Sequence, residues 1–469
     1  MRSWAQTHRP DIAALCMIGL AALARVPTLA QPLTENFAWR QTQTAWTDRI
    51  FHEQGIDLLH PEVPVHGPPW VFGFEFPLFQ ALGSLLMDAG LPADVAMRTL
   101  GLITFLATGW LVYVLVARLA GATASLVALG AFLFSPFGLV WGRTSLIEYL
   151  ATAAALGFLL AAVQWRQDRR PVTYALALAL GVTAMLVKIT TGAFYLLPLL
   201  AVRGRDGRPV ALRDWRLVPL IAVPSLAGLG WIAYIDGLKA SIPATAFQTS
   251  ARMIVFNFGT PALRLDPEFL VAVGAAIGVG LMGSGLLIWL PAALAKLRRI
   301  ADGPFLGALI VSVMVAAPLV LAPLYATQNY YPAAMSPVVA MLVGLGAAWG
   351  WEHRRSGVGR FVVLAGPALW IATLGVTLDY WTIGYAGVVD RDGSLPAAAY
   401  VRERTESDDW VVVDGRGWDP TILYYADRRG YMLDPRRGAV DDLARLRADD
   451  RYTIFVTCPY EDVCRDLAP

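Results

Sequence analysis

Long apolar stretches recur along this chain, and they constrain its fold more than any other feature does. Hydrophobic residues make up 56% of the sequence and charged residues 16%, whereas ordinary soluble domains contain roughly 25% charged residues. A run of about 20 apolar residues is long enough to cross the hydrocarbon core of a bilayer as a helix. The sequence therefore predicts a polytopic membrane protein whose fold class is an all-α bundle.

The predicted whole spans are separated by short polar or basic segments. They are Ile12–Leu29, Thr99–Ala117, Thr123–Trp141, Tyr149–Trp165, Leu217–Ile235, Phe269–Leu290, Phe305–Tyr325, Pro332–Trp351 and Phe361–Thr377. The first stretch has no small-residue cleavage site of the kind that ends a secretory signal, so we interpret it as a retained anchor.

The stretch Tyr174–Val202 is different because it runs between two basic loops and must cross twice or not at all. Each half would have about 14 residues, or about 21 Å of helix, which is shorter than the hydrocarbon core. We therefore predict a short hairpin with Lys188–Gly192 at its apex. With this hairpin the bundle has about 11 transmembrane helices.

Basic residues orient the bundle because they are concentrated in alternate loops. These loops contain Arg2, Arg9, Arg118, Arg166, Arg169, Arg170, Arg203, Arg205, Arg208, Arg213, Arg216, Lys296, Arg298, Arg299, Arg354, Arg355 and Arg360. The positive-inside rule makes that set cytoplasmic. We expect a multi-pass protein of the bacterial inner (plasma) membrane with a cytoplasmic N-terminus and a long first periplasmic or extracellular loop over residues 30–98.

The composition changes after Thr377, where Asp and Arg become frequent. Alternating apolar runs predict strands, and capped amphipathic segments predict helices. The expected strands are Trp410–Asp414 and Tyr452–Val456, and the expected helices are Ser394–Thr405 and Val440–Ala448. The sequence thus divides into a transmembrane domain, residues 1–378, and a small α/β domain, residues 379–469, which lies outside because it follows an odd number of crossings.

Two of the three cysteines lie close together in the exported segment. Cys458 and Cys464 are disulfide candidates, because an oxidising compartment would allow the bond. A metal pair is the alternative, but no further Cys or His lies nearby to complete a zinc site. Cys16, within the first span, is expected to be a core residue.

Acid, base, amide and indole side chains crowd the segment Glu35–Ala45, just past the first span. Polar groups at the mouth of a span usually mark a functional site. Glu35 is the leading candidate for a catalytic base. The other carboxylates expected at the outer interface are Glu75 and Glu148, and the candidate cations are Arg40, Arg143 and Lys188.

The sequence has no Walker loop, no dinucleotide glycine pattern after a strand and no Gly-x-Ser-x-Gly elbow. An exported site meets no ATP or sugar nucleotide, so the energy for a reaction must arrive with the substrate. A lipid that carries phosphate in its headgroup is the natural activated donor. Cations would then stabilise the departing phosphate while a carboxylate takes a proton from the acceptor hydroxyl.

Several motifs resemble those of GT-C type glycosyltransferases, specifically bacterial relatives of the dolichyl-phosphate-mannose protein mannosyltransferases (family 39) and of the aminoarabinose lipid A transferases. The matching elements are Glu35 with Trp39-Arg40-Gln41 and Thr44-Ala45, then Glu75-Phe76-Pro77-Leu78, Leu186-Val187-Lys188 and Tyr330-Tyr331-Pro332. The chain departs from the family at two positions, since Glu35 stands where aspartate is usual and Gln43 where the family tends to have an acid.

The resemblance implies an inverting transfer from a polyprenyl-phosphate sugar to a hydroxyl of a protein, lipid or glycan. It implies Glu35 as base and Arg40, Lys188 and Arg143 as ligands of the leaving phosphate. The residues expected to bind substrate or shape the site are Trp39, Gln41, Glu75, Glu148, Tyr330 and Tyr331. No cofactor is certain, although carboxylates beside a phosphate could bind a divalent cation such as Mg²⁺ or Mn²⁺.

Other interpretations remain open for several of these residues. Trp39, Tyr330 and Tyr331 also fit an interfacial aromatic belt. Lys188 could extend to the lipid headgroups, Arg143 and Glu148 could form a structural ion pair, and Glu75 could merely orient its loop. For the whole chain, the alternatives are a transporter or flippase of a polar lipid or solute, and a polymerase or ligase that joins lipid-linked glycans.

Overall fold

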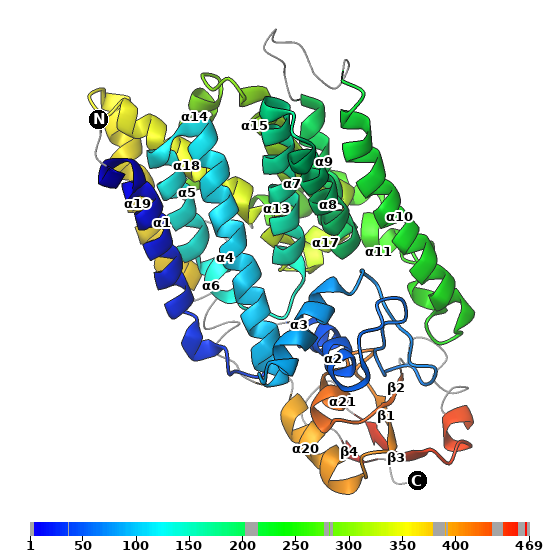
Figure 1. Ribbon diagram of the computed structural model, residues 1–469. Coiled ribbons are helices and arrows are strands. Elements are labelled where there is room, and N and C mark those ends of the chain that lie inside the picture. Colours follow the sequence, from blue (N-terminus) through cyan, green and yellow to red (C-terminus); the bar gives the residue numbers. More distant parts are fainter. Residues whose placement is uncertain are drawn as a thin grey trace.

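A computed structural model describes residues 4–35, 37–201, 214–275, 281, 285–378, 390, 393–433, 444–457 and 465–466. Helices form a tall bundle, and a small sheet packs with α2 and α3 at one end of it (Figure 1). We call the described residues from 393 onward the C-terminal unit.

The first half of the bundle contains both long helices and short connecting ones. Its elements are α1 (Trp4–Leu23), η1 (Val26–Thr28), α2 (Ala38–Gln54), α3 (Leu78–Asp88), α4 (Ala93–Ala120), α5 (Ala122–Phe134), α6 (Pro136–Trp141), α7 (Glu148–Asp168), α8 (Pro171–Val187), α9 (Ile189–Leu196) and η2 (Leu197–Ala201). The predicted first loop therefore contains two helices, and its last residues already belong to α4.

The second half is more fragmented. Its elements are α10 (Leu217–Ser241), η4 (Ala246–Gln248), α11 (Ile254–Phe258), α12 (Pro261–Leu265), α13 (Pro267–Ala275), α14 (Leu286–Leu297), α15 (Gly303–Ile310), η6 (Val311–Ala316), α16 (Ala317–Val320), α17 (Ala322–Thr327), η7 (Tyr331–Ala334), α18 (Ser336–Glu352) and α19 (Gly357–Leu378). The predicted span Phe269–Leu290 corresponds to α13 and the first part of α14.

The chain is a multi-pass membrane protein. Within the described residues, five helical segments are long and apolar enough to cross a bilayer: Pro10–Thr28, Ala93–Ala120, Glu148–Asp168, Leu217–Ser241 and Gly303–Val320. Shorter apolar helices, including α5, α8 and α14, lie among them. The expected total of about 11 crossings stays a prediction.

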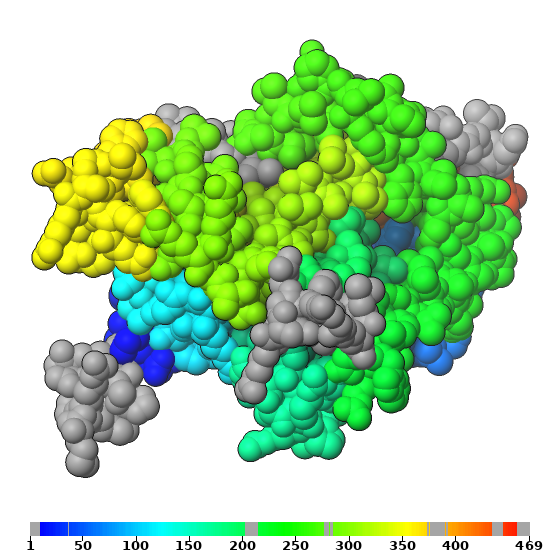
Figure 2. Space-filling model, turned by 90° about the horizontal axis from the view of Figure 1, so that it is seen from above, coloured from blue at the N-terminus to red at the C-terminus, as the bar shows by residue number. Residues whose placement is uncertain are grey.

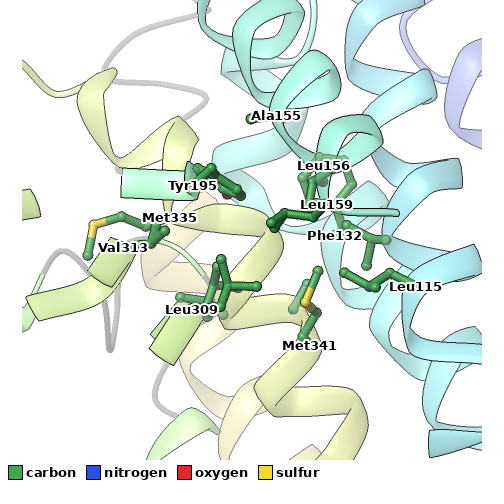
Figure 3. Packing of buried hydrophobic residues seen from close by; sticks show 14 of the residues in the cluster. Leu115, Phe132, Ala155, Leu156, Leu159, Tyr195, Leu309, Val313, Met335 and Met341 are labelled. Carbon is green, nitrogen blue, oxygen red and sulfur yellow. The ribbon is translucent and has the colours of Figure 1, made fainter. Parts of the chain in front are cut away.

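The predicted hairpin is present at α8 and α9. α8 descends to Val187, Lys188 has an extended backbone with φ −157° and ψ 93°, and α9 returns from Ile189. Tyr195 of α9 points into the apolar core of the bundle (Figure 3), where its hydroxyl donates to the carbonyl oxygen of Ala334 at 2.6 Å. The apex therefore lies at the end of the bundle that carries α2 and the C-terminal unit.

The C-terminal unit contains helices α20 (Ser394–Arg404) and α21 (Thr421–Ala426) and a four-stranded sheet of order β2-β1-β3-β4. β1 (Trp410–Asp414) lies parallel to β2 (Gly430–Leu433) and to β3 (Tyr452–Thr457), and β4 (Arg465–Asp466) is antiparallel to β3. The two predicted strands are confirmed, as is the helix that begins at Ser394. The sequence did not indicate β2 or α21.

Some expectations fall on residues that the structure does not describe. Cys458 and Cys464 lie outside the described residues, and so does the predicted domain boundary at 379. Of the helix expected at Val440–Ala448, only residues 444–448 are described, and residues 444–447 are helical. The disulfide and the boundary stay predictions. Cys16, in contrast, is described and is exposed, so the expectation that it is a core residue is wrong.

The C-terminal unit shares its core with the first loop. Met432 of β2 donates its N–H to the carbonyl oxygen of Val65 at 2.8 Å, and Gly67 donates to Gly430 at 3.2 Å, so loop residues extend the sheet at β2. One cluster of buried apolar side chains includes Val65 and Phe72 of the loop together with Val411 of β1. Folding of the loop and of the sheet is therefore coupled.

Candidate active site

Glu35 lies buried between two arginines that come from different parts of the chain. Arg98 of α4 donates from Nη1 to Glu35 Oε1 at 2.7 Å, and Arg143 donates from Nη2 to Oε2 at 3.3 Å. The Glu35 side chain is 5% exposed. Arg98 also donates to the carbonyl oxygens of Gln31 and Pro32. The carboxylate therefore helps to fasten the segment after the first span to α4.

Arg40 and Glu75 form a second ion pair between α2 and the loop before α3. Arg40 Nη2 lies 2.5 Å from Glu75 Oε1, and Arg40 Nη1 donates to Gln43 Oε1 at 3.0 Å. The Glu75 side chain is 23% exposed, more than that of any other carboxylate in this cluster. Next to it, Phe76 donates its N–H to Leu186 of the hairpin.

Lys188, at the apex of the hairpin, forms a third ion pair with Glu148 at the start of α7. Its Nζ lies 4.4 Å from the ring centroid of Tyr331 and 5.4 Å from that of Tyr330. Lys188 is buried, so it does not extend to the lipid headgroups as one alternative had it. Arg143 pairs with Glu35, and Glu148 pairs with Lys188. The Arg143–Glu148 ion pair suggested as an alternative is therefore wrong.

A turn before α7 connects the first ion pair to the other two. Ser145 donates its N–H to Gln41 Oε1 and its hydroxyl to the Gln41 carbonyl oxygen, both at 3.2 Å. Arg143 lies two residues before Ser145 and contacts Glu35, whereas Glu148 lies three residues after it and contacts Lys188. The predicted charged residues therefore form one polar layer, which we call the charged cluster.

Aromatic side chains surround the charged cluster. Phe37 packs edge to face on Tyr330, with ring centroids 5.0 Å apart. Trp418 of the C-terminal unit lies 4.7 Å from Trp39 and 5.8 Å from Phe74, measured between ring centroids. All of these rings except that of Tyr330 are partly exposed. The C-terminal unit thus reaches the edge of the cluster.

Two contributors to this region were missed by the reasoning from sequence. Arg98 lies one position before the predicted span Thr99–Ala117, and the signal for its role was a charged residue at the edge of a long apolar run. Trp418 lies 343 positions beyond Glu75, and no local pattern connects it to the first loop. Only the packing of the C-terminal unit against α2 brings it there.

Opposite charges set the protonation of the two loop carboxylates. Burial alone would raise the pKa of Glu35, but Arg98 and Arg143 outweigh it, so this pKa lies below its usual value. The pKa of Glu75 is likewise lowered, because Arg40 and Lys188 outweigh the effect of burial. Both carboxylates are therefore ionised and paired in the structure described here.

The carboxylates of the cluster each face a cation. Within the described part of the chain, no three His, Cys, Asp or Glu residues come together in a way that could hold a metal ion. The residues present therefore give no geometric support to the divalent cation considered from sequence, and we derive no step through one.

Comparisons with known proteins bear on the fold. Residues 73–223 match the family described as dolichyl-phosphate-mannose-protein mannosyltransferase. ArnT from Cupriavidus metallidurans in the apo state superposes with a TM-score of 0.63 at 14% identity, over 94% of this chain and 92% of that one. The same protein bound to undecaprenyl phosphate gives a TM-score of 0.62 at 13% identity, with the same coverage of both chains.

A further solved structure is the archaeal oligosaccharyltransferase AglB from Archaeoglobus fulgidus in complex with an inhibitory peptide and a dolichol-phosphate. It gives a TM-score of 0.60 at 13% identity, over 97% of this chain and 70% of that one. The comparison with curated proteins found no match. The structural likenesses show that this chain has the GT-C fold that its motifs predicted.

Proposed function

From this GT-C fold, we propose that the chain is an integral membrane glycosyltransferase that uses a polyprenyl-phosphate-linked sugar. It transfers the sugar, a hexose or a pentose, to a hydroxyl of a lipid, glycan or protein. One observation carries the proposal: Arg40 and Lys188, buried cations from separate segments, converge with Glu75 and Glu148 in one polar layer. The first relatives by structure include one bound to undecaprenyl phosphate and one in complex with a dolichol-phosphate.

The ion pairs provide a place for the donor phosphate. Arg40 and Lys188 are each neutralised by a carboxylate, so an entering phosphate would exchange with Glu75 and Glu148 rather than meet bare buried charges. The two cations would then stabilise the negative charge that develops on polyprenyl phosphate as the bond from its oxygen to the anomeric carbon breaks. The acceptor oxygen attacks the opposite face of that carbon, which gives inversion.

The same exchange would prepare a base. When phosphate takes Arg40 away from Glu75, the carboxylate loses a positive partner and gains a negative neighbour, and both changes raise its pKa toward neutrality. Glu75 is also the most exposed carboxylate of the cluster. Glu35, the base predicted from sequence, is held by two arginines, one of which is fully buried. We therefore propose Glu75 beside Glu35 for the proton-accepting role.

The two ends of the bundle differ, and the end opposite the C-terminal unit is hollowed. Figure 2 shows the bundle from the end opposite the C-terminal unit, where blue atoms are visible at the bottom of a hollow among green residues. The loops expected to be cytoplasmic also lie at that end, between α4 and α5, α7 and α8, and α14 and α15 (Figure 1). We propose that the charged cluster and the C-terminal unit lie on the outer face.

The test uses the full chain purified in detergent with a panel of short-chain polyprenyl-phosphate hexoses and pentoses. Mass spectrometry measures the release of polyprenyl phosphate by the wild type, Glu35→Gln and Glu75→Gln, with the exposed Glu403→Gln as matched control. We expect release by the wild type and the control. Loss of release in Glu75→Gln, with donor binding and melting temperature retained, would assign the base to Glu75.

The opposite pattern would assign the base to Glu35: full release with Glu75→Gln, and none with a Glu35→Gln variant that melts like the wild type. Release at the wild-type rate by both variants would contradict Glu35 and Glu75 as the base. If no donor is consumed while a labelled one crosses reconstituted vesicles, the chain is a transporter or flippase and the enzymatic proposal fails.

A further inference from the structure

A cavity of about 490 Å³ lies between α2, the first loop and the C-terminal unit. It is separate from the charged cluster, because none of the cluster's ionic residues lines it. The cavity is formed by segments more than 300 residues apart in sequence, from Trp46 to Arg429. Its volume is in the range of about 300–1,000 Å³ that is typical of sites for small molecules.

Three tryptophans, Trp46, Trp70 and Trp410, contribute to the lining. Trp70 has φ 67°, a left-handed conformation that is an outlier for a bulky residue, and backbone strain of this kind clusters at functional sites. Its ring meets that of Trp410 edge to face at 5.0 Å between centroids. The strained backbone thus places an indole in the wall of the cavity.

The charges of the lining nearly cancel. Three arginines, Arg49, Arg428 and Arg429, face four acidic residues, Glu53, Asp408, Asp409 and Asp427. Arg49 is already paired with Asp427 at 3.0 Å. A lining of this kind offers no excess positive charge to a phosphate or another polyanion. It suits a ligand that is neutral and has many hydroxyl groups.

Two of the acids are free to bind such a ligand. Glu53 and Asp408 are exposed, and within the described residues neither forms a hydrogen bond or an ion pair. An ionised carboxylate accepts hydrogen bonds at both oxygens and can therefore bind neighbouring hydroxyls of a sugar ring. Indole rings provide apolar contact area beside polar groups, which matches the mixed surface of a saccharide.

We propose that this cavity is a second carbohydrate site, which binds one or two sugar rings of a neutral glycan. The binding site itself does not depend on the proposed glycosyltransferase function; only the identification of the bound glycan as the acceptor rests on that function. Arg40 and Arg49 are nine positions apart in α2, about 13 Å along its axis and half a turn around it. The site would therefore hold a part of the acceptor that is distant from the reacting hydroxyl.

The experiment measures saccharide binding to the full chain in LDAO, a detergent without a sugar headgroup. A glycan array probed with fluorescently labelled protein selects the strongest neutral glycan, and isothermal titration then gives its Kd. The variants are Glu53→Ala/Asp408→Ala at the cavity rim and Trp70→Ala in its wall. Asp450→Ala is the matched control, because it removes an exposed acid outside the cavity.

We expect the rim variant to bind the selected glycan about tenfold more weakly, as for the loss of hydrogen bonds to a charged group. The control should bind like the wild type. Trp70→Ala should also lose affinity, and its melting temperature shows whether the fold survives. The proposed site would be overturned if the wild type bound no neutral glycan, or if the rim variant bound the glycan as tightly as the wild type. Preferential binding of tripolyphosphate would also overturn it.

Polyprenyl phosphate release separates this proposal from the proposed function. If the wild type binds the glycan and releases no polyprenyl phosphate from any donor, the carbohydrate site stands and the transferase fails. If the wild type releases polyprenyl phosphate while the rim variant binds glycan unchanged, the transferase stands and the second site fails.

Discussion

Asp48 is fully buried in α2, where its carboxyl group faces Gly83 of α3. A Cβ atom on Gly83 would lie 2.4 Å from Asp48 Oδ1, so only glycine leaves room for this carboxyl group. Neither carboxyl oxygen has a hydrogen-bond partner among the residues described. Burial raises the pKa of Asp48 to about 8; Arg49 opposes this shift and Asp88 adds to it.

This raised pKa makes the stability of the protein depend on pH. Between the ordinary value near 4 and about 8, folded Asp48 keeps a proton that the unfolded chain has released, so the free energy of unfolding falls as pH rises. Asp48→Asn is neutral at every pH and should lack this loss. We expect it to be more stable than the wild type at pH 9 by about 1–3 kcal/mol.

Thermal unfolding of the detergent-purified protein at pH 4 to 9 checks this expectation, with the exposed Asp450→Asn as control. Wild type and control should lose stability across the interval, while Asp48→Asn should show a flatter profile. Parallel profiles for all three proteins would mean that Asp48 titrates normally.

At the scale of elements, α4 and the turn before α7 approach each other at Gly101. A Cβ atom at this position would lie 2.2 Å from the carbonyl oxygen of Thr144, a backbone atom that cannot rotate away. Arg143, next to Thr144, contacts Glu35. The absence of a side chain on one helix thus determines where the turn places a charge of the cluster.

Gly101→Ala should therefore reduce sugar transfer without altering any polar residue. The added methyl group must push the turn away from α4, which lengthens the 3.3 Å contact between Arg143 and Glu35. We expect a loss of roughly 1–3 kcal/mol in stability, as for overpacking, and a clear fall in polyprenyl phosphate release.

Gly230→Ala in α10 is the matched control, because nothing lies within 4 Å of the added atom. It should be neutral or slightly stabilising, since alanine is the better helix former. Equal activity of the two variants and the wild type would show that the position of the turn does not matter for transfer.

The length of the apolar runs predicted many helices, but local caps and prolines divide several of these runs into shorter helices. Thr123–Trp141 reads as one span, yet it divides into α5 and α6 because Ser135 caps a new helix, accepting a hydrogen bond from Gly138 N at 3.0 Å. Within Phe305–Tyr325 the helical segment ends at Val320, and after a turn at Leu321 the short helix α17 begins, with Pro323 in its first turn. Hydropathy averages over a window and does not register a cap or a proline inside an apolar run.

The ionic members of the site were predictable because each lies near the end of a predicted span, and a charge at such a place usually has a function. Their pairing was not: sequence spacing suggested Arg143 with Glu148, whereas the fold pairs Glu148 with Lys188, 40 positions later. The pairing depends on how α7 packs against α8 and α9, and this packing cannot be predicted from a local sequence pattern. The catalytic roles of these residues stay predictions.

At the scale of the whole molecule, the two ends of the bundle differ in structure. Among the described residues, one end is formed by loops and helix termini, while the other carries α2, α3 and the C-terminal unit on one continuous core (Figure 1). Val65 is 0% exposed in that core, and its carbonyl oxygen accepts from Met432 of β2. The C-terminal unit is thus part of the structure that positions the first loop and its charged residues.

This shared core predicts that the first loop and the C-terminal sheet open together. Val65→Ala removes apolar contacts but leaves the backbone hydrogen bond, and it should cost about 1–3 kcal/mol. Hydrogen exchange followed by mass spectrometry should show faster exchange both in residues 61–72 and in β1 and β2, by the same factor, because one cooperative unit opens.

Val358→Ala, at a side chain that is 64% exposed in α19, should change neither segment. Faster exchange confined to the loop would show that the sheet is stable on its own, and the C-terminal unit would then be a separate cap.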